Sequence, residues 1–408
     1  MAQKRVAIIG GGPAGLRAAE IAAQAGHRVT VYDGKPSVGR KLLLAGAHGG
    51  LNLTHSDPLD LFITRFGAAQ AAMKPCLESF TPADLTLWAQ ELGQKTFVGT
   101  SKRVFLKEMQ AKGLLRAWLA RLAAQGVAFA PSHRWIGWDA AGELLFLGPD
   151  AQEITARADA TLLALGGASW PRTGSDGSWY EILEAQNIPL SPLEPANCGF
   201  IVPWSPYIAH RFAGKPLKPV TVTFGGDTRQ GELTVTEKGL EGSLIYALSP
   251  ALRSAIISEG RAVIELDLRC GLSVEDLTER LKMPRKALSF SNYLRKASGL
   301  SPLSIALIRE VVPPESLPVN DCAALAALIK KLPVTLTATA GLDRAISTAG
   351  GVRFDALDAA FMLKHKAGVF IAGEMLDWEA PTGGYLLQGV LSSATHAARG
   401  LCAYLNQA

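Results

Sequence analysis

The chain has 408 residues, of which 48% are hydrophobic, so it can bury a large core and is not a disordered protein. Its 41 basic and 36 acidic residues leave a formal charge of +5 without long lysine or arginine blocks, so nucleic acid is a poor expected partner. The five cysteines are far apart and form no CxxC pair, which excludes a disulfide framework and favours a reducing compartment.

The sequence also lacks the usual signals for export, membrane insertion and several enzyme classes. No signal-peptide core and no apolar stretch long enough to cross a membrane is present, so we expect a cytoplasmic protein. There is no GxSxG elbow, HExxH pair, Walker loop or Cys/His metal spacing. We therefore expect a small-molecule substrate, no metal, no membrane and no dedicated protein partner.

Residues 5 to 33 read as a buried strand, a glycine turn, an alanine-rich helix and a second strand. Gly10, Gly12 and Gly15 have the GxGxxG spacing, with Pro13 and Ala14 between them. The first glycine permits the turn, the second lets a pyrophosphate approach the backbone, and the third lets the helix pack on the strand. The helix N-terminus then offers amide donors to phosphate. This β-α-β unit predicts a dinucleotide site, with a plain tight turn as the alternative.

Asp33 ends the second strand, 23 residues after Gly10. A carboxylate there can accept hydrogen bonds from the ribose diol of an adenosine, which favours a ribose without a 2′-phosphate. NAD enzymes and FAD enzymes share this unit, so the unit alone leaves both cofactors open.

Two further segments can complete the dinucleotide site. An apolar strand within residues 156 to 177 runs into Gly166 and Gly167. Residues 126 to 130, GVAFA, follow a helical pattern, and the Val127 backbone can hydrogen-bond adenine, although a core strand explains this segment equally well.

The pattern of apolar and turn-forming residues changes from about residue 190. Short alternating strands between Pro/Gly turns predict a β-rich substrate-covering domain, followed by amphipathic helices that open on Ser or Asp. We expect this part to be nested in the first domain. The predicted domains are 1–189 with 346–408, 190–271 with 333–345, and a helical subdomain at 272–332.

The tail, residues 368 to 389, reads GVFIAGEMLDWEAPTGGYLLQG. In FAD proteins of the two-dinucleotide-binding-domain type, a late strand returns beside the first and delivers an acid to the ribityl or pyrophosphate region. The double glycine begins a helix to about Leu405, whose free amides can face the flavin pyrimidine. Solvated loop acids and a plain turn are the alternative. The expected cofactor contacts here are Gly373, Glu374, Asp377, Gly383, Gly384 and Tyr385.

Five motifs in order resemble a known family: GGGPAG, VGRKLLLAGAHGGLNLTHS, GGASWPRTGSDG, STAGGV and GEMLDWEAPTGGY. The family comprises bacterial FAD flavoproteins that are aminoacetone-oxidase-like or bile-acid-reductase-like, and the resemblance covers nearly the whole chain. It implies an α/β fold with a Rossmann-like FAD-binding domain of the two-dinucleotide-binding-domain flavoprotein type, a nested β-rich domain and a small helical subdomain.

The resemblance also assigns the segment after the second strand. Arg40 and Lys41 resemble the family's basic pair beside the diphosphate, and His48, Asn52 and Thr54 lie in a loop that can run under the isoalloxazine. His48 and Asn52 are the only candidates for catalysis, and an exposed loop histidine is the simpler explanation of the first. The chain has Gly50 and Leu51 where most relatives have Arg and Cys, so no thiol role transfers to it.

The expected function is hydride transfer between a small organic substrate and flavin N5. The chain has no second GxGxxG for a nicotinamide domain. This leaves an oxidase of a small, aminoacetone-like amine or an NAD(P)H-linked reductase, with NAD(P)H as a transient donor. The alternative from another class is a non-catalytic or redox-sensing flavin-binding protein whose insert recruits a partner. A first motif that holds NAD instead of FAD is a third interpretation, which the tail motif disfavours.

Overall fold

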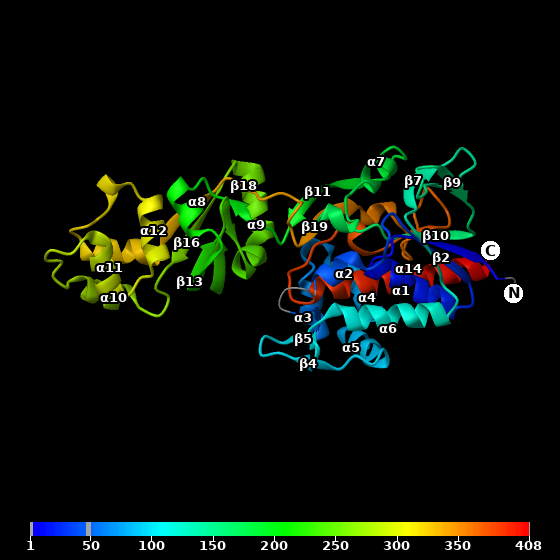
Figure 1. Cartoon of the computed structure of the whole chain (residues 1–408), viewed down its shortest axis with the longest axis horizontal. Coiled ribbons are helices and arrows are strands. Elements are labelled where there is room, and N and C mark those ends of the chain that lie inside the picture. Colours follow the sequence, from blue (N-terminus) through cyan, green and yellow to red (C-terminus); the bar gives the residue numbers. More distant parts are fainter. Residues whose placement is uncertain (1–2, 46–49, 408) are drawn as a thin grey trace. The chain divides into compact units, whose positions relative to one another are not determined.

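The structure is a computed structural model that describes residues 3–45 and 50–407. The chain forms two compact units: the first comprises the described residues of 1–194 and 346–408, and the second comprises 195–345. The second unit is thus an insertion in the sequence of the first, and it contains both the β-rich and the helical segments. Figure 1 shows the elements of each unit.

A five-stranded parallel sheet forms the centre of the first unit, in the order β20-β10-β1-β2-β6. Its strands are β1 (Arg5–Ile9), β2 (Arg28–Asp33), β6 (Ala128–Pro131), β10 (Ala160–Leu163) and β20 (Val369–Ile371). All of β10 and all of β1 except Arg5 are buried, as expected for apolar strands covered on both faces. The predicted β-α-β unit and fold class are confirmed. In one detail the expectation was wrong, because β10 separates the late strand β20 from β1.

Three helices run beside one another in the first unit (Figure 1). Helix α1 (Pro13–Gln24) packs against α14 (Tyr385–Gln407) and also contacts α6 (Ala111–Ala124). The alanine-rich sequence of α1 permits this close approach, since five of its alanines, Ala14, Ala18, Ala19, Ala22 and Ala23, are buried or half-buried. Helix α14 brings the C-terminal segment against the N-terminal one, and it extends two residues beyond the predicted end.

Smaller elements surround this core. The other helices of the first unit are α2 (Arg40–Ala45), α3 (Leu59–Thr64), α4 (Gln70–Ser79), α5 (Pro82–Glu91), α7 (Trp179–Glu184) and the short 3-10 turns η1 (Gly67–Ala69), η2 (Pro171–Thr173), η4 (Phe354–Ala356) and η5 (Gly373–Met375). Its remaining strands form two three-stranded sheets and one pair: β3 (Asn52–His55) with β4 (Thr96–Val98) and β5 (Arg103–Leu106), β7 (Arg134–Trp138) with β8 (Leu144–Leu147) and β9 (Glu153–Ala156), and β11 (Leu190–Ala196) with β19 (Ser347–Val352).

The second unit contains a seven-stranded sheet in the order β17-β16-β13-β14-β15-β12-β18, with antiparallel pairing throughout. Its strands are β12 (Phe200–Ile201), β13 (Lys215–Phe224), β14 (Asp227–Val235), β15 (Gly239–Glu241), β16 (Ala262–Asp267), β17 (Leu332–Leu336) and β18 (Ala338–Thr339). Burial alternates along β16 and β17, so one face of these strands packs on the core and the other meets solvent.

The helices of the second unit are α8 (Pro206–Phe212), α9 (Ser243–Glu259), α10 (Val274–Leu281), α11 (Phe290–Ser298), α12 (Pro302–Val311), α13 (Cys322–Lys330) and the turn η3 (Pro314–Ser316). The predicted caps are confirmed, because the side chains of Ser273, Ser301 and Asp321 each accept a hydrogen bond from the first turn of their helix. Helix α9 was not expected within a segment predicted to be β-rich.

Candidate active site

The glycine turn between β1 and α1 is closed by contacts that only glycine permits. A Cβ on Gly15 would lie 1.8 Å from the Gly10 carbonyl oxygen, and a Cβ on Gly10 would lie 2.3 Å from the Ala164 oxygen. At Gly12, by contrast, a Cβ would meet no atom within 4 Å. Pro13 occupies the first helical turn, where its missing N–H removes no helical bond. The turn therefore leaves the backbone at Gly12 and the free amides of α1 open to a ligand.

Asp33 lies directly beside this turn. Its Oδ2 accepts a hydrogen bond of 2.8 Å from the Gly11 N–H, and its Oδ1 accepts one of 2.8 Å from the Lys35 N–H. Burial raises the pKa of Asp33, although these two N–H groups and the nearby charge of Arg40 oppose the rise. Each oxygen keeps a second lone pair, so the carboxylate can hold the loop and still accept from a ribose hydroxyl.

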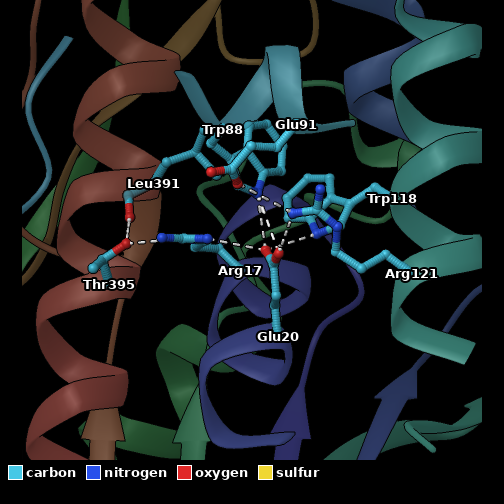
Figure 2. A network of polar contacts seen from close by, with 8 residues as sticks. All are labelled: Arg17, Glu20, Trp88, Glu91, Trp118, Arg121, Leu391 and Thr395. Carbon is cyan, nitrogen blue, oxygen red and sulfur yellow. Dashed lines mark hydrogen bonds and ion pairs between the residues drawn. The ribbon is translucent and has the colours of Figure 1, made fainter. Parts of the chain in front are cut away.

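A buried polar network, drawn in Figure 2, holds α1 in place behind the turn. The fully buried Glu20 carboxylate lies 3.0 Å from Nη1 of Arg17 and 3.0 Å from Nη1 of Arg121. The indole N–H groups of Trp88 and Trp118 also donate to it. These partners come from α1, α5 and α6, so the network ties three helices to one carboxylate.

The same network reaches α14 through Arg17. The Arg17 Nε donates to Thr395 Oγ1 at 3.0 Å, and this hydroxyl donates to the Leu391 carbonyl (Figure 2). Burial lowers the pKa of Arg17, against the raising effect of Glu20. No buried side-chain polar atom of this network lacks a partner among the described residues, so the network acts as a rigid support for the helix that carries the glycine turn.

A second cluster joins segments that are far apart in sequence. The Lys41 Nζ lies 2.7 Å from Glu374 Oε2 and donates to Ser169 Oγ at 2.7 Å. The other Glu374 oxygen accepts a 3.0 Å hydrogen bond from the Thr348 N–H. Gly166 faces this cluster, since a Cβ there would lie 4.0 Å from Glu374 Oε2. The predicted residues Lys41, Gly166 and Glu374 are therefore brought together.

Two other predicted residues carry polar atoms without a partner. The Arg40 Nε and the Asn52 Oδ1 are both buried and make no hydrogen bond within residues 3–45 and 50–407. A buried polar atom without a partner is costly, and a bound ligand is one common way to satisfy it. His48 lies outside the described residues.

The structure places Thr54 and Val127 in the protein interior. The Thr54 hydroxyl, fully buried, donates to Gln388 Oε1 at 2.7 Å, which ties β3 to α14. The Val127 N–H donates to the Leu122 carbonyl at 3.1 Å, and the residue precedes β6. The Val127 N–H and the Thr54 hydroxyl are thus both engaged within the chain.

The tail glycines make close backbone contacts at the start of α14. A Cβ on Gly384 would lie 2.4 Å from the Thr54 carbonyl oxygen, and a Cβ on Gly383 would lie 3.0 Å from Arg103 Nε. Gly373 similarly faces Ala14, with a Cβ separation of 2.8 Å. The Asp377 carboxylate accepts a 2.6 Å hydrogen bond from Ser191, so this acid orients the loop. The two glycine-bearing ends of the chain consequently lie together in one unit.

Tyr385 extends the site into a third polar cluster, with Asp57 and His55. The Tyr385 hydroxyl donates to Asp57 Oδ2 at 2.7 Å, and its ring stacks on His55 at 4.9 Å between centroids. Burial and the Asp57 carboxylate raise the pKa of Tyr385. Burial would raise the pKa of Asp57, but the Tyr385 hydrogen bond and neighbouring positive charges outweigh it and lower the pKa. Burial lowers the pKa of His55. At neutral pH the trio is a phenol, a carboxylate and a neutral imidazole.

Sequence reasoning missed several residues of these clusters. Ser169 and Ser175 lie within a motif that was recognised, yet only the fold shows that their hydroxyls face Lys41. Arg103 meets Gly383 from β5, and the sequence carries no local signal for that contact. His55 follows Thr54 directly, and its place near the acid Asp57 was the available signal.

These features together fit an FAD cofactor. The open Gly12 backbone and α1 amides suit a diphosphate, Asp33 suits a ribose, and the α14 amides suit an electron-rich ring edge. The unsatisfied atoms of Arg40 and Asn52 would gain partners from such a ligand. Across the part of the chain that the structure describes, no group of three or more His, Cys, Asp or Glu side chains could hold a metal ion. Nor does any helix there have the length and apolar character to cross a membrane.

Fold and site together define a Rossmann-type FAD flavoprotein with an inserted second unit. Residues 4–400 match the family described as HI0933-like protein Rossmann domain, and the chain belongs to that family. The resemblance predicted from the motifs is thereby confirmed, and the chain is a member of a family of FAD-dependent oxidoreductases.

Two curated relatives match almost end to end. The 3-dehydro-bile acid delta(4,6)-reductase of Clostridium scindens is 24% identical over 97% of this chain and 98% of its own. The ribosomal RNA dihydrouridine synthase of Escherichia coli is 25% identical over 97% of each chain. Among solved structures, 3-ketosteroid delta1-dehydrogenase from Sterolibacterium denitrificans covers 99% of this chain and 100% of its own, with a TM-score of 0.54 and 12% identity. This last likeness concerns the fold alone.

Proposed function

We propose that this protein is an FAD-dependent reductase that adds hydrogen across a carbon–carbon double bond conjugated with a carbonyl group, and that NADH or NADPH supplies the electrons. The proposal rests on two observations in the first unit: the space beside Gly12 is open, and the buried atoms of Arg40 and Asn52 lack partners among the described residues. A bound cofactor can occupy such a space and supply such partners.

The names of the relatives support a reductase over an amine oxidase. A keto group beside a ring double bond, as in a 3-dehydro Δ4 bile acid, polarises that bond toward hydride addition. The ring double bond of uracil is conjugated with a carbonyl in the same way. A reductase and a dihydrouridine synthase therefore share one type of reaction, and full-length matches to both favour it over amine oxidation.

The chain's residues have distinct tasks in this proposal. FAD, when bound, supplies the hydride-transfer chemistry that side chains cannot. The Gly12 backbone and α1 amides hold its diphosphate, Asp33 holds the adenosine ribose, and Arg40 adds positive charge. The free amides at the start of α14, with Arg103 beside Gly383, would favour negative charge on a flavin ring held there. Asn52 orients the ring or the substrate through its unpaired amide oxygen.

The overall reaction balances with one reduced nicotinamide and one proton. Hydride from NADH or NADPH reaches the substrate carbon distal to the carbonyl, and a proton adds to the adjacent carbon. The products are the saturated ketone or dihydropyrimidine and the oxidised nicotinamide. The Tyr385 hydroxyl is committed to Asp57 and has a raised pKa, so it remains protonated at neutral pH and does not act as a base.

An anaerobic reductant screen of the FAD-loaded protein tests the proposal. NADH or NADPH should bleach the flavin absorbance, and an enone or a uracil-containing substrate should then restore it. Aminoacetone should leave the flavin oxidised. If only the amine bleaches the flavin, and peroxide forms on aeration, the protein is an amine oxidase. If no amine, enone or reduced nicotinamide changes the flavin, the non-catalytic alternative gains.

A further inference from the structure

A cavity of about 500 Å³ lies within the second unit, where α12 contacts both α8 and α11. Its lining includes two buried apolar residues of α12, Ile305 and Ala306. The lining also includes Ser291, Asn292 and Arg295 from α11, Tyr207 from α8, and Arg309 from α12. This volume is in the range of small-molecule sites, and a mixture of apolar residues with a few polar groups is typical of them.

Two guanidinium groups at this cavity lack an acidic partner. Arg295 and Arg309 are exposed, and within the described chain neither forms an ion pair with a carboxylate. Arg309 makes one long contact, 3.5 Å to Ser291 Oγ. Some cations elsewhere in this unit do pair with acids, as Lys330 does with Asp267 at 2.6 Å and Lys218 with Glu232 at 3.0 Å. The cavity therefore presents positive charge that a bound anion would neutralise.

The one acid that lines the cavity is engaged elsewhere. Both oxygens of Glu310 accept hydrogen bonds from Ser205, one from its backbone N–H and one of 2.7 Å from its hydroxyl. Ser205 is the N-cap residue of α8, so Glu310 serves the start of that helix. Two cations and one engaged anion leave the cavity with an excess of one positive charge.

An aromatic ring completes the arrangement. The Tyr207 side chain is 57% exposed, which is unusual for a large ring in a unit whose other aromatic side chains are largely packed. Arg211 lies 5.9 Å from its ring centroid and Phe212 meets it edge-on. An exposed ring that lines a cavity together with arginines is a combination that can stack on a base and bind its phosphate.

We propose that this cavity binds a nucleotide, with Arg295 and Arg309 on the phosphate and Tyr207 against the base. Two sources offer this chemistry: a unit of a single-stranded RNA and a free nicotinamide dinucleotide. The inference deepens the proposed function, on which its biological meaning rests, because either ligand would enter that reaction as substrate or as electron donor. Overall charge gives no reason to expect nucleic acid, so the inference depends on this local arrangement.

Paired variants of the FAD-loaded, full-length protein test the proposal. R295A/R309A removes the two cavity cations, and R261A/R280A is the matched control, because it removes two exposed arginines of the same unit that do not line the cavity. One probe is a fluorescent single-stranded oligouridine, followed by anisotropy at several salt concentrations. The other probes are NAD⁺ and NADP⁺, followed by calorimetry, which avoids any turnover.

The cavity variant should weaken the binding of the relevant probe at least about tenfold, since it loses charge-assisted hydrogen bonds, and the control should change it less than about twofold. For RNA, loss of two phosphate contacts should also lower the slope of log affinity against log salt by about 1.4. Y207A should weaken binding at least about fivefold with the slope unchanged, because stacking releases no counterions.

The probe whose binding the cavity variant weakens shows whether the ligand is single-stranded RNA or a free nicotinamide dinucleotide. The proposal is overturned if R295A/R309A weakens the binding of neither probe more than R261A/R280A does. It is also overturned if inorganic phosphate competes as strongly as either nucleotide. These binding measurements do not depend on flavin reduction. A protein whose flavin resists NADH and NADPH but whose RNA binding needs Arg295 would refute the proposed function and leave this inference standing.

Discussion

Two groups of buried charge in the first unit differ in one respect. Around Glu20, two arginines and two indoles surround one carboxylate (Figure 2), and none of their buried polar atoms lacks a partner among the described residues. Among the predicted cofactor-binding residues, Lys41 and Glu374 pair, but the Arg40 Nε and Asn52 Oδ1 have no partner among the described residues. Both groups combine a carboxylate with basic side chains, and they differ in whether the protein alone satisfies their buried polar atoms.

That difference separates a support from a binding site. A fully satisfied network stiffens the fold and gains nothing from a ligand. An incomplete one is stabilised when a ligand supplies the missing groups, because a ligand that binds only the folded state shifts the unfolding equilibrium. We therefore expect changes at the first group to alter the stability of the protein, and changes at the second to alter FAD affinity.

The largest effect is expected for E20A. Removal of the carboxylate leaves two buried guanidinium groups without their partner, which should lower the free energy of unfolding by about 3–5 kcal/mol. Chemical denaturation of the FAD-free protein measures this. The control is E91A, whose side chain is 56% exposed and 3.9 Å from Arg121, and which should cost less than about 1 kcal/mol. Equal losses in the two variants would contradict a structural role for Glu20.

Next comes G12A, which should separate binding from folding. Gly12 has a φ of −78° and open space around its Cβ position, so alanine should alter the free energy of unfolding by less than about 1 kcal/mol. The same methyl group would occupy the path of the diphosphate, and FAD affinity should fall at least about 100-fold. G271A, also in open space, serves as the control. Unchanged FAD affinity in G12A would show that the diphosphate does not bind at this turn.

A smaller contrast compares N52L with Q388L. Leucine at Asn52 removes an unsatisfied oxygen, so the FAD-free protein should keep or gain stability, while FAD affinity falls about tenfold. Leucine at Gln388 leaves the buried Thr54 hydroxyl without its acceptor and removes one of the two hydrogen bonds to the Phe80 carbonyl, which keeps the bond from Ser392, so the free energy of unfolding should fall by about 1–3 kcal/mol. Thermal melts with and without FAD distinguish the two patterns, and a destabilised N52L would show that Asn52 is part of the core.

The smallest predicted effect is a pH dependence from His55. Its folded-state pKa is lowered by burial, so below the ordinary value of 6.5 the unfolded chain binds more protons than the folded one. Stability should decline as the pH falls below about 6.5, with a slope from this residue of at most about 1.4 kcal/mol per pH unit. His27 shifts the same way, so H55N should flatten the decline only in part. An identical profile for H55N and wild type would contradict the shift.

Much of the fold could be predicted because its signals are local. The glycine spacing, the apolar strands and the Ser or Asp caps each depend on a few adjacent residues. Helix α9 was missed although Leu244, Leu248 and Leu252 follow one helical face, because Pro250 lies within it and removes a backbone donor. The Glu20 network could not be predicted, since its indole partners are 68 and 98 residues away.

The residues of the candidate site also divide into those with a local sequence signal and those that only long-range contacts reveal. Gly12 and Asp33 follow from spacing within one β-α-β unit. The pairing of Lys41 with Glu374 joins residues 333 positions apart, and only the likeness of the tail to FAD proteins of the two-dinucleotide-binding-domain type indicated that it returns to the front. The engagement of Thr54 with Gln388 is a packing result that no local pattern contains.

Titration of FAD-free wild-type protein with FAD and with NAD⁺ tests the central claim most directly. We predict that one FAD binds per chain, that the protein acquires the visible flavin absorbance, and that NAD⁺ in excess does not displace the FAD. A protein that stays colourless, or that binds NAD⁺ as tightly as FAD, would contradict this claim.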